Sequence, residues 1–119
     1  EFGHKPTDEE IRTLVMSWYN RQTDAAILSG FTYNGASVWL SVANQYNYKA
    51  AYDLAVQTGG ETLPVTFKFG SDEHPEYHTF SRLDELKDFY TKAVRYIQKV
   101  LAEGWEKKDK FNLDLYRIK

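Results

Sequence analysis

The side chains best suited to chemistry lie together in residues 72–78. This segment, DEHPEYH, holds two imidazoles, His74 and His78, and three carboxylates within seven residues. Histidines and carboxylates are common metal ligands and general acid–base groups. Helical spacing would put both imidazoles on one face, but Pro75 and the neighbouring strand pattern place them in a turn and a strand. A solvated hairpin loop explains the same residues. We therefore predict no metal site, cofactor or catalytic residue here; an enzyme would need these histidines to converge with a carboxylate in a cleft.

No other catalytic pattern stands out in the sequence. No serine lies in a G-x-S-x-G motif, and the chain has no cysteine. Gly59-Gly60 lacks the spacing and the following Lys-Ser/Thr of a phosphate-binding loop. The acidic runs at residues 8–10 and 84–85 fall where helices are expected to begin, and a helix N-terminus favours acids. The sequence thus predicts a protein that is not an enzyme.

The composition is that of one folded domain rich in aromatic residues. A chain of 119 residues can bury a core without disulfides. Its net charge of −2, with acids and bases interspersed, argues against nucleic acid as a partner, and no apolar run is long enough to cross a membrane. Aromatics make up 16% of the residues, and Tyr and Trp are favoured at interfaces. We expect residues 1–5 to be a disordered or cloning-derived start, and 6–119 to be a single α+β domain.

Local signals predict two β-hairpins and three helices. Asn34-Gly35 between apolar runs predicts a type I′ turn and a hairpin over residues 31–39. Alternating apolar residues on both sides of a turn-forming loop predict a second hairpin over 63–80. Together the hairpins form a small antiparallel sheet on which the helices pack.

The predicted helices cover about residues 8–28, 42–57 and 82–105. Thr7, Ser41 and Ser81 are the expected N-caps. In the second helix the expected packing stripe is Ala43, Tyr46, Ala50 and Leu54, flanked by Ala51 and Ala55. The tail 106–119 alternates apolar and polar residues, which fits a helix end or an added strand equally well.

Several sequence blocks resemble an uncharacterised domain family of bacteriophage and prophage proteins, often encoded near tail-fibre or tail-assembly genes. The resemblance covers residues 24–110 and rests on these blocks: DAAILSGFTYNG (24–35), SVANQYNY (41–48), LPVTFKF (63–69), YHTFSRL (77–83), and the final helix leading to Gly104-Trp105 and Lys107-Lys108. It implies a virus-derived domain with no established activity that cooperates with tail proteins, in the cytoplasm of the bacterial host during assembly or in the virion. It brings no catalytic residue.

Six residues are candidates for an interaction surface: Trp18, Tyr19, Trp39, Gln45, Asn47 and Trp105. The aromatic residues suit a stacking platform for sugars or a partner protein, or else burial in the domain or an oligomer interface. We expect the first two on the packing stripe of the first helix, and Trp39 on the inward face of its hairpin. The two amides either bind a neighbouring loop or hairpin backbone or contact a ligand.

The leading function hypothesis is a protein-interaction or tail-assembly module whose partner is a tail component or a second copy of the chain. The alternative is a receptor- or glycan-binding module associated with a tail fibre. An exposed apolar patch would favour assembly, whereas a groove lined with aromatics and amides would favour sugar.

Overall fold

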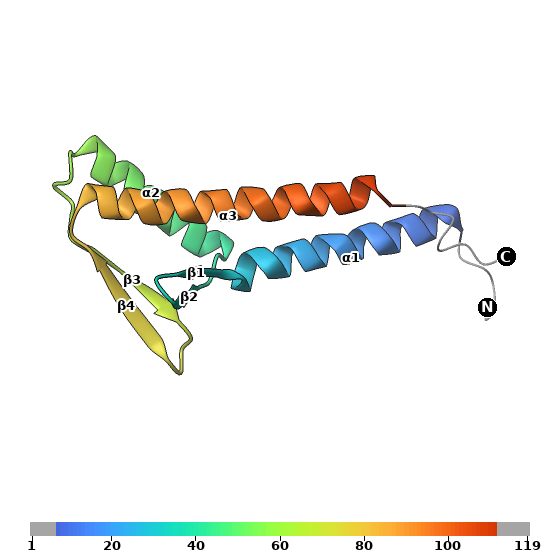
Figure 1. Cartoon of the computed structure of the whole chain (residues 1–119), viewed down its shortest axis with the longest axis horizontal. Helices are drawn as coiled ribbons and strands as arrows, with labels where there is room; N and C mark the ends of the chain where they lie inside the picture. Colours follow the sequence, from blue (N-terminus) through green and yellow to red (C-terminus); the bar gives the residue numbers. More distant parts are fainter. Residues whose placement is uncertain (1–6, 112–119) are drawn as a thin grey trace.

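The computed structural model describes residues 7–111 as three helices and two β-hairpins (Figure 1). In chain order the elements are α1 (Asp8–Ser29), β1 (Phe31–Tyr33), β2 (Ala36–Val38), α2 (Val42–Gln57), β3 (Val65–Gly70), β4 (Pro75–Phe80) and α3 (Leu83–Asp109). The predicted α+β class is confirmed, and α2 has its predicted bounds. The predictions for residues 1–5 and for the last part of the tail lie outside the described residues, while α3 continues four residues beyond its predicted end.

Each hairpin forms its own two-stranded antiparallel sheet, rather than the single small sheet that was predicted. Asn34 and Gly35 both have positive φ, 51° and 83°, which confirms the predicted type I′ turn. β3 pairs with β4 from Val65 opposite Phe80 to Gly70 opposite Pro75. Within residues 7–111 no hydrogen-bonded ladder joins the two sheets, so they depend on side-chain packing for their stability.

An aromatic cluster around Phe89 of α3 holds the hairpins and α2 together. Phe89 is fully buried. Its ring centroid lies 5.1–6.3 Å from those of six aromatic neighbours on four elements: Phe31, Tyr33, Tyr48, Phe67, Phe69 and Phe80. We call the two hairpins, α2 and the first half of α3, which meet at this cluster, the head.

Two of the three predicted N-caps are confirmed. The backbone N–H of Glu10 donates to Thr7 Oγ1 (3.0 Å), and that of Asn44 donates to Ser41 Oγ (3.1 Å). The prediction for Ser81 was wrong, because α3 begins one residue later and its N-cap is Arg82, whose side chain makes no capping bond.

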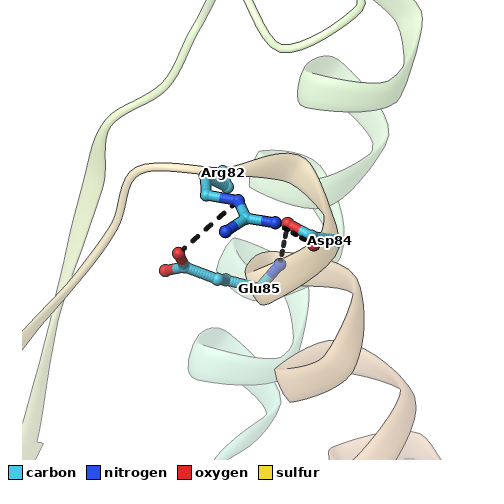
Figure 2. A network of polar contacts seen from close by, with 3 residues as sticks. All are labelled: Arg82, Asp84 and Glu85. Carbon is cyan, nitrogen blue, oxygen red and sulfur yellow. Dashed lines mark hydrogen bonds and ion pairs between the residues drawn. The ribbon is translucent and has the colours of Figure 1, made fainter.

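At the start of α3, charged side chains stabilise the helix end in place of a capping side chain (Figure 2). Asp84 accepts a hydrogen bond from the backbone N–H of Glu85 (3.0 Å) and pairs with the Arg82 guanidinium (2.6 Å). Carboxylates in the first turn also compensate the helix dipole, so this end is stabilised without a serine.

Away from the head, α1 and the second half of α3 run antiparallel as a two-helix stalk (Figure 1). The stalk gives the fold a radius of gyration of 19.8 Å, against roughly 13–14 Å for a compact chain of this length. The Tyr96 hydroxyl donates to the Ala26 carbonyl (2.7 Å) across the helix pair. Farther out, Gly104 is buried against Thr23, where a Cβ would lie 2.5 Å from Thr23 Oγ1.

We predict that Gly104→Ala destabilises the stalk, although alanine is the better helix former by about 1 kcal/mol. The added methyl group must push Thr23 away, so the free energy of unfolding should fall by about 1–3 kcal/mol in urea denaturation. Adding Thr23→Ala should restore most of this loss because it removes the colliding atoms. Greater stability of the single variant would contradict close helix packing here.

Candidate functional site

The histidine-rich segment forms a turn and a strand, as predicted. The backbone N–H of His74 donates to Ser71 Oγ (3.0 Å) in the β3–β4 turn. His78 lies in β4. The centroid of its ring is 4.5 Å from that of the Phe80 ring and 5.8 Å from that of the Tyr33 ring. Among residues 7–111 no three His, Asp or Glu side chains are placed to hold a metal ion. His74 thus belongs to the β3–β4 turn, and His78 belongs to the aromatic packing of β4.

The prediction of which face of α2 packs was wrong. Tyr46 is 75% exposed and Leu54 49%, whereas Tyr48 and Ala55 are buried. Because α2 carries apolar residues on two sides, spacing alone did not distinguish them. The ring centroids of Tyr48 and Phe67 are 4.7 Å apart in the aromatic cluster. Because the Tyr48 side of α2 faces this cluster, the predicted stripe faces outward.

The outward turn of α2 leaves an apolar groove between α2 and α3. Its volume is about 280 Å³, and its apolar lining includes Leu40, Val42, Tyr46, Tyr90, Val94 and Ile97. Val42 at its rim is 84% exposed. We call this feature the α2–α3 groove.

The two predicted amides have different environments. Gln45 Nε2 donates to the Leu40 carbonyl (2.7 Å) at the groove, which confirms that it binds a neighbouring backbone. Asn47 is exposed on α2 and is not among the residues that line the groove. Lys49 at the groove edge pairs with Asp53, and this hydrogen bond raises the pKa of Lys49.

Trp39 points outward, contrary to the prediction. Its neighbours Val38 and Leu40 are 1% and 2% exposed, while Trp39 itself is 43% exposed, because successive side chains of an extended segment point to opposite sides. Trp39 borders two shallow hollows at the hairpin turns, together called the Trp39 cleft. Their polar lining includes Ser37, Asn44, Asp72, Glu73, His74 and Glu76.

The remaining aromatic candidates lie on the stalk. Trp18 is 50% exposed, so its predicted place on the packing stripe was wrong; its ring lies 5.3 Å from that of the half-buried Tyr19. Trp105 is 58% exposed, beside Asn20 and Asp24 of α1. The six candidate residues are thus divided between α2, the Trp39 cleft and the stalk, rather than forming one site.

A polar network ties the first hairpin to α3. The Tyr33 hydroxyl donates to Asp88 Oδ2 (2.9 Å), and Lys92 pairs with the same oxygen (3.0 Å). Burial and the bond to Asp88 raise the pKa of Tyr33 from 10.0 to about 12. The bonds from Lys92 and Tyr33 lower the pKa of Asp88. Neutral Tyr33 and ionised Asp88 are therefore both favoured in the folded chain.

Comparison with known families adds one finding. Residues 10–118 match a domain of unknown function, DUF4376. The chain belongs to this family. The match to the DUF4376 family includes α1, so both stalk helices are part of the matched domain. No curated protein and no solved structure matches the chain. In the part described, no helix of this DUF4376 domain is long and apolar enough to cross a membrane.

We predict that the DUF4376 domain loses stability in alkali through Tyr33. Because the pKa of Tyr33 is higher in the folded chain, this contribution to the free energy of unfolding is full below pH 10 and declines as pH rises toward 12. Urea unfolding measured by circular dichroism at several pH values tests this.

In the same series, Tyr33→Phe should be less stable near neutral pH by about 1 kcal/mol and should lose less stability between pH 10 and 12. The exposed Tyr77 gives the control, Tyr77→Phe, which should follow the parent. An equal alkaline loss in parent and Tyr33→Phe would show that Tyr33 is not responsible.

Proposed function

We propose that this DUF4376 domain is a non-enzymatic protein-interaction module of phage or prophage origin that helps assemble tail components. It would act in the bacterial cytoplasm during assembly or within the virion. The sequence blocks that resemble phage and prophage domains support the context. The α2–α3 groove is the single observation that carries the interaction function.

The groove fits a large apolar side chain of a protein partner. Its volume of about 280 Å³ is suited to one aromatic or branched aliphatic side chain, and its lining is mainly apolar. Val42 and Tyr46 at the opening are 84% and 75% exposed, so a partner that covers them would remove apolar surface from water. Interface energy is typically concentrated where such anchors fill a pocket.

The groove is tested by co-expressing the tagged domain with each tail-fibre or tail-assembly protein encoded beside its gene. We expect one of these proteins to co-purify stoichiometrically. Val42→Asp should lower its affinity at least tenfold, because an unpaired carboxylate would be buried at the contact. The fold should survive, since residue 42 begins α2, where an acid is favoured.

Asn47→Asp gives the matched control, because it adds the same charge at an exposed position of α2 outside the groove lining. It should bind like the parent. Full binding by Val42→Asp would show that the groove is not the binding site. Failure of every neighbouring protein to co-purify would argue against the assembly function.

The Trp39 cleft supports a second candidate function, the binding of a glycan. An exposed indole beside hydroxyl, amide and carboxylate groups can stack on a sugar ring while those groups hydrogen-bond its hydroxyls. The backbone of Trp39 is fixed by a bond from Asn44 Nδ2 to its carbonyl (2.8 Å), which keeps the side chain beside both hollows.

A glycan array of bacterial surface sugars tests this candidate. We expect binding that Trp39→Ala reduces at least tenfold, because it removes the stacking surface. Trp105→Ala removes another exposed indole and should leave glycan binding unchanged. No bound glycan, or equal binding by Trp39→Ala, would exclude the cleft as a sugar site.

A further inference from the structure

The outer side of α1 carries a mainly apolar stripe that the rest of residues 7–111 leaves exposed. Its members are Leu14, Trp18, Arg21, Ala25 and Leu28, all exposed, which we call the outer stripe. Their spacing alternates four and three residues, as along the seam of a coiled coil. The three large members, Leu14, Trp18 and Leu28, are 67%, 50% and 38% exposed.

The outer stripe is separate from the face of α1 that packs on α3. That face meets α3 through Thr23, beside Gly104, and through the Ala26 carbonyl, which accepts from Tyr96. Ile27 on the same side packs against the core, so α1 carries apolar residues on two sides. A helix with apolar residues on two sides is typical of one that packs against neighbours on both.

Four members of the outer stripe are complementary to one another when two copies of α1 pair antiparallel. If two copies of α1 pair antiparallel about an axis between residues 19 and 20, Trp18 faces Arg21 of the second copy, and Leu14 faces Ala25 of the second copy. A guanidinium stacks well on an indole, and a leucine fits over an alanine. Each contact occurs twice, as a two-fold interface requires.

A parallel pairing is disfavoured by the same residues. It would place the two Arg21 side chains together and the two Trp18 rings in one layer. The first contact is repulsive and the second is overcrowded. The order of residues in the stripe thus selects the antiparallel arrangement.

We propose that a second copy of this chain docks antiparallel on the outer stripe of α1 to form a two-fold dimer. This deepens the proposed interaction function by naming one partner, and it uses a different face from the α2–α3 groove. The stripe from residue 14 to residue 28 spans about 21 Å of helix. Such a contact is at the lower end of specific interfaces, so the dimer fraction rises with protein concentration.

Cysteine cross-linking tests the register, because the natural chain has no cysteine. Leu14→Cys and Ala25→Cys are mixed at a concentration where the parent dimerises, oxidised, and analysed by non-reducing electrophoresis. The mixture should form a disulfide-linked dimer. Each variant alone should not, because its two copies of the cysteine would lie about 16 Å apart along the helix, too far for a disulfide.

Self-linkage of Leu14→Cys alone would overturn the antiparallel register. A mixture that cross-links no faster than Asn47→Cys, an exposed control on α2, would overturn docking at the stripe.

Sedimentation equilibrium gives a second readout without cysteines. Trp18→Ala should weaken self-association at least tenfold, whereas Trp105→Ala, at an indole outside the stripe, should not. Circular dichroism confirms that both variants are folded. A monomeric parent at all concentrations overturns the proposal, as does an unchanged dimer of Trp18→Ala.

Failure of this proposal is distinguishable from failure of the groove. Val42→Asp should dimerise through α1 like the parent, whether or not this substitution weakens the binding of a tail protein.

Discussion

The packing of aromatic rings around Phe89 is the constraint on which the head of this DUF4376 domain depends. β1, β2, β3 and β4 form two separate hairpins, and a two-stranded hairpin alone is at best marginally stable in water. Phe89 contacts rings from β1, α2, β3 and β4, so one side chain of α3 replaces the backbone ladder that would otherwise join the sheets. Arg82, Asp84 and Glu85 make their contacts at the start of α3 (Figure 2), and Phe89 follows in the same helix.

This arrangement also determines which apolar residues remain outside. Tyr48 is the residue of α2 that packs in the cluster. Because this side of α2 faces inward, Val42 and Tyr46 lie at the surface. Most of the stalk extends beyond the cluster, and there α1 and α3 pack on each other (Figure 1). The exposed apolar surfaces thus follow from a core built at one end of an elongated molecule.

Features fixed by residues adjacent in the chain could be predicted from the sequence. The turn at Asn34 and Gly35 and the caps at Thr7 and Ser41 depend on three or four residues each and were confirmed, whereas the cap expected at Ser81 was not. The direction in which a helix or strand faces depends on distant partners and could not be predicted with equal success. Tyr46 and Tyr48 are chemically alike, and only the rings of β3 and α3 distinguish them. Trp39 was assigned to the inward face of its hairpin, but the alternation with Val38 and Leu40 was a signal that could have corrected this.

The separation of the candidate surfaces has a consequence for function. The outer stripe belongs to α1, the groove to α2 and the first half of α3, and the Trp39 cleft to the hairpin turns. None of these three surfaces shares a lining residue with another. A dimer joined through α1 would then present two grooves and two clefts, and a partner with repeated sites would bind it more tightly than a monomer, because the second contact forms at a high local concentration. Weak individual contacts are therefore compatible with a stable assembly, and the elongated stalk is the element that would set the distance between the paired heads.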